Sequence, residues 1–532
     1  MLPYFYTMKF SYKQVSKFLL ALSLGIGSFY IYTSPKTLIP AWDTRANVEA
    51  ALLPFSASLH LRIGPYSQRE APWAFRWQII NSVHGRVTFP IRHWEDRFLG
   101  KTFEQQFQAG KISSMGEQNF VVQAKSGEDG YADTFGPVPG LVASPLIAIA
   151  KLFLQGGNGW GDSAFWVGRY LGAFFVSISV AAVFLISVQY LSIVLALLIT
   201  VCFAFGTSAW SILSQGFWLQ SVTVCFIGLG LLFYVLGEKK KRYDFLCGLF
   251  LGLAAAARMP NIAILATVIL FLLWEKHFLR ALYIAILGFV PIGLLLLYNS
   301  RLFGSPWLTG QMIRGHLDAV QKTGSPDLWS TPMLTGLVGN LVSPSRGLLI
   351  YSPVLIFGLV GIVLSFRDKK FIAFRPLGVA FLVQLIVAAK WFDWWGGWTY
   401  GNSNLADATL FLLLSLVPFF AKMGKDLRVI LLFLPIMVFS IYVHWLGAYV
   451  YDDVNWNNRT FLVSAGEKTH VAAHKVNILR QSIRVNQNLI SMDINNKEFR
   501  NRLWDWKDNP IYFYATHADD ALLMREQFST YQ

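Results

Sequence analysis

Long apolar segments separated by short polar stretches run along this chain from residue 18 to residue 448. About eleven of them have a length close to that of a membrane-crossing helix, which needs about 20 predominantly apolar residues. These segments are 18–32, 164–188, 191–210, 217–236, 245–257, 262–274, 281–298, 347–366, 372–389, 405–421 and 429–448. The pattern therefore predicts an all-α polytopic membrane protein, a bundle of about eleven transmembrane helices.

Short basic loops between these segments predict the orientation. Cytoplasmic loops of membrane proteins are enriched in lysine and arginine. If the N-terminus, with Lys9, Lys13 and Lys17, starts in the cytoplasm and every segment crosses once, four basic loops fall on the cytoplasmic side. They are 237–242, 275–277, 367–370 and 422–428. This result requires that 245–274 crosses twice and that the apolar patch 141–154, which contains Pro145 and Lys151, lies at the interface or re-enters without crossing.

This orientation divides the chain into two parts. Residues 1–450 form the transmembrane domain, which includes a large first external loop with interfacial helices at 36–163. Residues 451–532 form an external C-terminal tail. The segment 301–346 also lies outside, so three polar regions share the outer side of the cytoplasmic (inner) membrane.

Composition supports the membrane class. The 532 residues are 54% hydrophobic and 14% charged, with mean hydropathy +0.45, whereas soluble proteins carry about a quarter charged residues. The net charge of +15 is explained by basic loops, and nucleic acid is not expected as a partner. Membrane lipids are expected to surround the bundle as partners. The three cysteines, Cys202, Cys225 and Cys247, lie in apolar segments without metal-binding or redox spacing.

Arg258 interrupts an apolar region and is followed by Met259-Pro260. An arginine at the centre of a membrane helix costs about 2.5–3.5 kcal/mol on insertion scales, so it needs a reason. The flanking segments are short, and we expect two helices to meet at Arg258 and to place its guanidinium at the floor of an outward-facing cavity. The guanidinium either binds a lipid phosphate, whose geometry it matches with two parallel hydrogen bonds, or is paired internally.

A turn rich in aromatic residues and glycine follows the segment 372–389. It reads Lys390-Trp391-Phe392-Asp393-Trp394-Trp395-Gly396-Gly397-Trp398-Thr399-Tyr400-Gly401. An aromatic belt at the membrane interface is the ordinary explanation. A saccharide site is the alternative, because aromatic faces stack on sugar rings, and Trp395, Trp398 and Tyr400 are the candidates. Asp393 either pairs with Lys390 or faces a cavity.

Asp43 follows the first apolar segment, next to Thr44 and Arg45, where it is either a solvated acid or a base near the bilayer surface. Hydrogen bonding and the charge of Arg45 would keep it ionised. Other acids of the first loop, Glu95-Asp96 beside His93 and Asp129 with Asp133, match no metal motif, although Mg²⁺ or Mn²⁺ prefers such oxygen ligands. We therefore assign no metal ligands and leave the cofactor unknown. Phosphate-binding glycine loops and dinucleotide fingerprints do not occur, which argues against a soluble nucleotide-sugar donor.

Several motifs along the chain occur in a recognisable order. They are Asp43-Thr44-Arg45 with Leu53-Pro54, Phe135-Gly136-Pro137-Val138-Pro139-Gly140, Ala257-Arg258-Met259-Pro260, Phe303-Gly304-Ser305-Pro306, Ser345-Arg346-Gly347-Leu348 with Tyr351-Ser352-Pro353, Trp395 to Gly401, and Leu503-Trp504-Asp505-Trp506. Together they resemble the bacterial GT-C superfamily of membrane glycosyltransferases, such as the protein O-mannosyltransferases, aminoarabinose transferases and rhizobial galacturonosyltransferase-like proteins.

This resemblance implies a reaction class. The donor is a polyprenyl-phosphate sugar, the acceptor is a hydroxyl of a lipid, glycan or protein, and an acid of the first external loop acts as general base. The resemblance places that role on Asp43 and implies inversion at the anomeric carbon. Arg258, Arg346 and Arg45 are then the candidates for binding the donor phosphate.

Two departures leave alternatives open. Relatives often carry Gly-Pro-Arg after the tryptophan-glycine motif, where this chain reads Gly401-Asn402-Ser403, and often show two adjacent acids where Asp43 is followed by Thr44. The chain is therefore alternatively a non-catalytic relative. A transporter or flippase of a lipid-linked sugar is a further alternative, although transporters usually carry internal repeats and polar residues near the midplane.

Overall fold

The computed structural model of the chain describes residues 12–33, 121–123, 131–153, 160–464, 467–473, 475–476, 479 and 487–523. Among these residues, seven helices are long and apolar enough to cross a membrane. They are α1 (Tyr12–Tyr32), α8 (Trp160–Ser187), α9 (Ile193–Phe205) continued by α10 (Ser208–Ser211), α11 (Leu219–Gly237), α14 (Phe278–Phe303), α19 (Arg375–Lys390) preceded by η4 (Lys369–Phe374), and α22 (Leu427–Tyr449). The expected helical membrane protein is thus confirmed.

The other four expected spans are helical but short or broken. They are α12 (Arg242–Ala257), α13 (Ile262–Trp274), the series α17 (Leu348–Tyr351), η3 (Pro353–Leu355) and α18 (Ile356–Arg367), and the pair α20 (Thr409–Leu414) and α21 (Leu416–Met423). Proline, which has no backbone N–H, stands at two of the breaks, as Pro260 and Pro353. The count of eleven crossings therefore stays a prediction.

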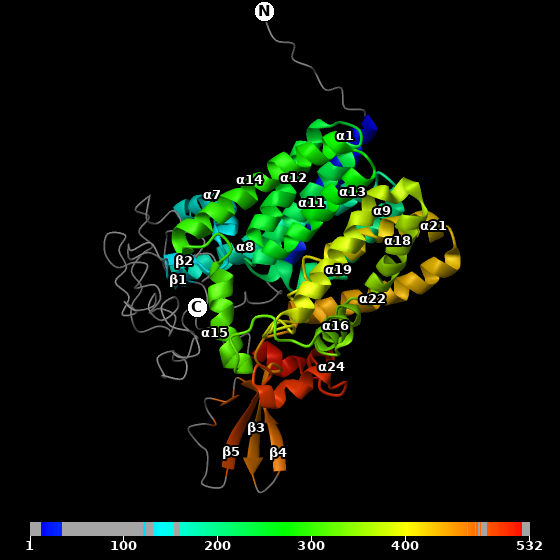
Figure 1. The fold of residues 1–532 in the computed structure, drawn as a ribbon. Helices are drawn as coiled ribbons and strands as arrows, with labels where there is room; N and C mark the ends of the chain where they lie inside the picture. Colours follow the sequence, from blue (N-terminus) through cyan, green and yellow to red (C-terminus); the bar gives the residue numbers. More distant parts are fainter. Residues whose placement is uncertain are drawn as a thin grey trace, which may run out of the picture.

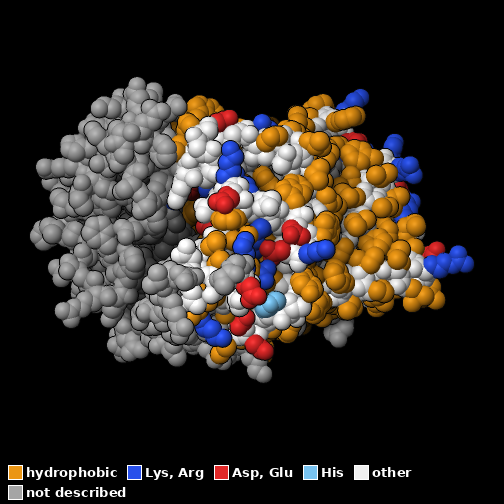
Figure 2. All heavy atoms as spheres, turned by 90° about the horizontal axis from the view of Figure 1, so that it is seen from below, with side chains coloured by type: hydrophobic (Ala, Val, Ile, Leu, Met, Phe, Trp, Pro, Cys, Tyr) orange, Lys and Arg blue, Asp and Glu red, His pale blue; other side chains and the backbone are white. Residues whose placement is uncertain are grey.

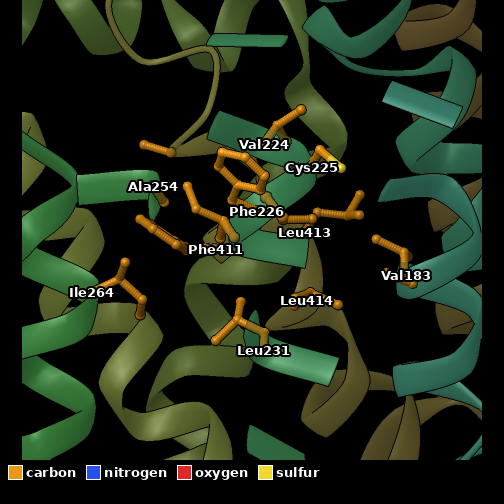
Figure 3. Close-up of a cluster of buried hydrophobic side chains, with 14 of the residues drawn as sticks. Val183, Val224, Cys225, Phe226, Leu231, Ala254, Ile264, Phe411, Leu413 and Leu414 are labelled. Atoms are coloured by element: carbon orange, nitrogen blue, oxygen red, sulfur yellow. The ribbon is translucent and has the colours of Figure 1, made fainter. Parts of the chain in front are cut away.

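The core of the bundle lies where α8, α11, α12, α13 and α20 meet (Figure 3). Phe226 and Leu231 of α11, Ala254 of α12, Ile264 of α13 and Phe411 of α20 are all buried there. Lipid tails are as apolar as these side chains, so close packing rather than the hydrophobic effect has to hold such helices together. Helix α12 lies between α11 and α14, and it contacts both along its length.

Ion pairs connect the four basic loops at one end of the bundle. Three pairs link the loops in sequence, and they are Asp244 with Arg280 at 2.9 Å, Glu275 with Arg375 at 3.1 Å, and Asp368 with Lys422. Because the loops meet at one end, the shared side predicted from charge is consistent with the structure. Which end faces the cytoplasm stays a prediction.

The opposite end carries the segment 301–346 and the tail (Figure 1). The elements there are α15 (Gly310–Thr323), α16 (Met333–Val342), β3 (Asn458–Ser464), β4 (Glu467–Val471), β5 (Gln487–Asp493), η5 (Lys497–Trp504) and α24 (Pro510–Thr516). The three strands form an antiparallel sheet in the order β4-β3-β5, with Phe461 opposite His470 and Ile490. This sheet projects from the bundle and was not expected from the sequence, so the all-α description holds for the membrane part and not for the tail.

The first external loop is described only in part. It contributes a hairpin of β1 (Val121–Gln123) and β2 (Tyr131–Asp133), followed by α7 (Pro137–Phe153). Helix α7 includes the apolar patch expected to be interfacial, with Pro145 inside the helix. It packs against α8 and α12.

Acidic and basic side chains lie together on the tail-bearing face. Figure 2 shows this face with acidic and basic side chains gathered near its centre, beside a broad surface of hydrophobic side chains. An apolar surface of this kind is expected where a bundle meets lipid, whereas polar groups are expected where it meets water. The chemistry of the chain is therefore to be sought at this end.

Candidate functional site

The turn between α19 and α20 is built around three glycines with positive φ. Gly396, Gly397 and Gly401 have φ of 72°, 70° and 85°, a region that side chains other than hydrogen rarely adopt. At Gly401 a Cβ would also lie 3.0 Å from the ring of Tyr351. The glycines of the motif thus allow the chain to fold tightly over the helix ends and to present its aromatic residues on several sides.

Arg346 stabilises this turn by hydrogen bonds to its backbone. Its Nε donates to Trp395 O at 3.0 Å, and its Nη2 donates to Gly397 O at 3.1 Å and to Asn457 Oδ1 at 2.7 Å. Its Nη1 donates to Ser345 O at 2.8 Å. The side chain is fully buried, and burial lowers the pKa of its guanidinium. Arg346 therefore joins the turn to the tail, and most of its donors are used within the protein.

The aromatic candidates of the turn also contact the tail or a neighbouring helix. Trp395 Nε1 donates to Asn495 Oδ1 at 3.2 Å, and Trp398 Nε1 donates to Asp493 Oδ1 at 2.8 Å. Tyr400 Oη donates to the carbonyl oxygen of Val443 at 2.9 Å, and burial raises its pKa. Trp395 and Tyr400 are buried, while Trp398 is half-buried. Of the three, Trp398 is thus best placed to meet a ligand.

Asp393 forms an ion pair with Lys322 of α15, and not with Lys390. Its other oxygen accepts the backbone N–H of Gly397 at 3.1 Å. Arg500 of η5 stacks on Trp395, with its guanidinium carbon 4.4 Å from the ring centroid, and it donates to the carbonyl oxygen of Lys322. Three segments far apart in the sequence, α15, the turn and the tail, thus meet at Asp393.

Arg258 lies at the junction of α12 and α13, as the sequence predicts, and it is paired internally. Its Nη1 donates to Asp407 Oδ1 at 2.6 Å, and its Nη2 donates to Asn404 O at 2.8 Å. Asp407 also accepts hydrogen bonds from Asn261 at 2.9 Å and from Thr223 at 3.2 Å. The buried carboxylate is therefore fully compensated, which satisfies the requirement on an ion at membrane depth.

Asn404 connects Arg258 to the turn that carries Asp393. Its side-chain Nδ2 donates to the backbone carbonyl oxygen of Asp393 at 2.7 Å, and its own backbone carbonyl oxygen accepts from Arg258. Five of the six described candidates thus belong to one polar layer, whereas Tyr400 packs among Tyr351, Tyr451 and Tyr514. With their direct partners, this layer contains four cations against three carboxylates, an excess of one positive charge. The cations are Arg258, Lys322, Arg346 and Arg500, and the acids are Asp393, Asp407 and Asp493.

Asp43 and Arg45 lie outside the described residues, as do His93, Glu95, Asp96 and Asp129. Nothing in the structure tests their roles. Across the described part of the chain there is no group of three or more histidines, cysteines or acids that would hold a metal ion. The three cysteines are all buried and unpaired with one another.

Five residues of the layer were not identified by the sequence analysis. They are Lys322, Asn404, Asp407, Asp493 and Arg500. Asp407 carried a usable signal, because a lone acid near the start of an apolar segment needs a cation, and Arg258 was available. No sequence signal identifies Lys322 and Arg500, because they lie 71 and 107 positions from Asp393 in polar segments rich in charge.

The fold and this layer define a polytopic helical membrane protein with a charged, aromatic-rich layer at the tail-bearing end of its bundle. No protein-family model matches the chain, and no curated protein matches it either.

Proposed function

We propose that the protein is an inverting glycosyltransferase that moves a sugar from a polyprenyl-phosphate donor to an acceptor hydroxyl on the outer face of the cytoplasmic membrane. Asp43 is the general base in this proposal. The N-terminus is cytoplasmic and the tail is external. The acceptor is a hydroxyl of a lipid, a glycan or a protein.

The observation that carries the proposal is the polar layer at the tail-bearing end. It combines an excess of positive charge, which suits the phosphate of a lipid-linked donor, with indole rings, which suit a sugar. Both lie at the end of the bundle that carries the tail, because Arg346, Trp395 and Trp398 contact tail residues. A lipid-borne head group would present its phosphate and sugar at this depth.

In the proposed reaction, the carboxylate of Asp43 takes the proton of the acceptor hydroxyl. The oxygen then attacks the anomeric carbon from the face opposite the lipid phosphate, which leaves with the electrons of the broken bond. Cations near that phosphate lower the barrier, because negative charge develops on it in the transition state. Arg45 and Arg258 are the proposed ligands. The contacts of Arg346 favour a positioning role, in which it holds the turn.

Mass spectrometry of envelope lipids and glycans tests the proposal. A strain lacking the gene should lose one sugar modification, and expression of the wild-type chain should restore it. The Asp43→Asn variant should reach the membrane at normal abundance and restore nothing, because an amide cannot accept the proton. Asp426→Asn, a change of the same kind in an exposed basic loop, is the matched control and should restore the modification.

A non-catalytic relative is the second candidate. The internal pairing of Arg258 favours it, and so does Gly401-Asn402-Ser403, where Asn402 donates to Asn340 Oδ1 at 2.6 Å and so serves the fold. Under this alternative, the deletion strain changes no envelope glycan, and Asp43→Asn behaves like the wild type. Restoration by Asp43→Asn would therefore exclude the catalytic role of Asp43.

A further inference from the structure

The junction of α15, the turn and the tail contains cations whose hydrogen-bonding capacity exceeds what the described protein supplies. An ammonium group has three N–H donors and a guanidinium has five. Within the described part of the chain, Lys322 Nζ makes one hydrogen bond, to Asp393. Among the same residues, Arg500 donates only through Nη2, to the carbonyl oxygens of Lys322 and of Asn495.

Among these donors, the Nε atom of Arg500 gives the strongest indication of a missing ligand. It is buried and has no hydrogen-bond partner among the described residues. A buried donor left without a partner costs about 1–3 kcal/mol, so such groups are rare and call for an explanation. The guanidinium lies over the ring of Trp395, so it cannot move away to reach water without giving up that contact.

The charges at the junction leave room for an anion. Lys322 pairs with Asp393. Burial lowers the pKa of Arg346 and of Arg500, and the nearby charge of Asp393 opposes this effect only in part. The second carboxylate at the junction, Asp493, accepts hydrogen bonds from the indole N–H of Trp398 and the backbone N–H of Asn495. Three cations thus face two carboxylates. Arg346 is buried and committed to backbone oxygens, so Lys322 and Arg500 are the two that remain open to a ligand.

We propose that Lys322 and Arg500, which both lie against the ring of Trp395 and are joined by the hydrogen bond from Arg500 Nη2 to the carbonyl oxygen of Lys322, form an oxyanion site that takes a phosphate group. A phosphate oxygen would accept from Arg500 Nε and Nη1, and another from the spare donors of Lys322 Nζ. Arginine suits this role because its donors match the geometry of phosphate, and lysine adds a point charge. A bound phosphate would tie α15, the turn and the tail together.

The site does not depend on the proposed transfer reaction, because binding is measured without turnover. The phosphate can belong to a lipid head group or be free in solution, and the two sources share the same chemistry. Half-buried Lys322, with a side chain 17% exposed, is accessible enough for either source.

Thermal unfolding of the full-length chain in detergent tests the site. The probes are a polyprenyl monophosphate, the matching polyprenol without phosphate, inorganic phosphate and phosphatidylglycerol. We expect polyprenyl monophosphate to raise the Tm of the wild type with increasing concentration, and polyprenol to leave it unchanged. Arg500→Gln and Lys322→Gln should each weaken the binding at least about tenfold, which is the loss expected for one charge-assisted hydrogen bond.

Two further variants separate binding from folding. Lys497→Gln changes an exposed lysine on the same η5 element and should bind like the wild type. The double variant Lys322→Gln/Asp393→Asn removes both members of the ion pair, so it leaves no unpaired charge, and it should fold yet bind weakly. Unchanged binding in Arg500→Gln and in the double variant would overturn the proposal.

The probes also separate this proposal from the glycosyltransferase proposal. If no phosphate probe stabilises the wild type, the oxyanion site is wrong, whatever the envelope analysis shows. If inorganic phosphate binds through Lys322 and Arg500 while polyprenyl monophosphate does not, the site stands with a soluble ligand. The lipid-linked donor then loses its support. Stabilisation by phosphatidylglycerol alone would show a bilayer-lipid site and would also remove the donor from it.

Discussion

The role of a single charged residue in this chain depends on the group with which it pairs. Arg258 illustrates this, because its position in an apolar region predicted either a phosphate ligand or an internal pair. The structure shows the pair, with Asp407 as the partner. A guanidinium that already serves a buried carboxylate can take part in binding only through its remaining donors, so its first role is to hold α12, α13 and the following loop in place.

The Arg258–Asp407 pair gives a prediction at this scale. Arg258→Met should lower the free energy of unfolding by about 3–5 kcal/mol, because it leaves the fully buried Asp407 carboxylate without its cation. Arg258→Met/Asp407→Leu should recover most of the loss, since no unpaired charge remains. Denaturation in detergent provides the measurement.

The control for this pair is Arg428→Met, which changes an exposed arginine of a basic loop and should unfold like the wild type. A wild-type stability for Arg258→Met would show that Asp407 does not depend on Arg258. Sequence reasoning found Arg258 because a charge in an apolar run is conspicuous. It missed Lys322 and Arg500, because a charge in a polar segment is ordinary until the fold brings it beside Asp393.

Helix packing depends on glycines that the hydrophobic pattern does not identify. Gly248 and Gly252 lie on the face of α12 that meets α14. A Cβ at either position would lie 2.2 Å from a carbonyl oxygen of α14, that of Ile284 or of Gly288. Small residues four apart are typical of close contacts between membrane helices. Contact between the two backbones, rather than side-chain burial, therefore positions the helix that ends at Arg258.

At the scale of helices, we predict that Gly252→Ala destabilises the protein. Alanine favours a helix over glycine by about 1 kcal/mol, so any loss comes from crowding, which typically costs about 1–3 kcal/mol. Gly293→Ala in α14 is the matched control, because its Cβ would meet nothing within 4 Å, and it should be neutral or stabilising. Equal Tm values for the two variants would mean that α14 moves aside without cost.

The elements of the tail were the least predictable. Strands β3 and β5 pair across up to 35 positions, the separation of the partners Asn458 and Asp493. No clean alternation of apolar and polar residues marks the three strands of the tail. The helices of the membrane part were predictable because lipid requires every backbone group to be bonded within its own segment. Outside the membrane, water relaxes that requirement, and pairing between distant segments decides the structure.

The arrangement of the whole molecule places four basic loops at one end and the tail at the other. Charge counting predicts which end is cytoplasmic, and the ion pairs between the loops agree that they share one side. The short helix α13 also runs from one end of the bundle to the other. Arg258, just before it, contacts Asn404 at the tail end, whereas Glu275, just after it, pairs with Arg375 at the end with the basic loops.

Cysteine accessibility tests this topology. The three native cysteines are buried, so single cysteines can be introduced without removing them first. We expect Lys468→Cys in the tail to react with a membrane-impermeant thiol reagent in intact spheroplasts. Lys240→Cys and Lys425→Cys should react only after permeabilisation. Labelling of Lys425→Cys from outside would place an even number of crossings between it and the tail, and the predicted orientation would be wrong.

The amino-acid sequence by itself determined the class of this protein, the positions of its apolar helices and the side on which its basic loops gather. These properties follow from local composition, because a bilayer selects helices by length and hydrophobicity. Only the tertiary structure decided which cation meets which carboxylate, how the glycine turn is held by Arg346, and that Lys322 and Arg500 converge on Asp393. Such contacts join residues far apart in the chain, and they form only when the packing of the helices and the tail brings them together.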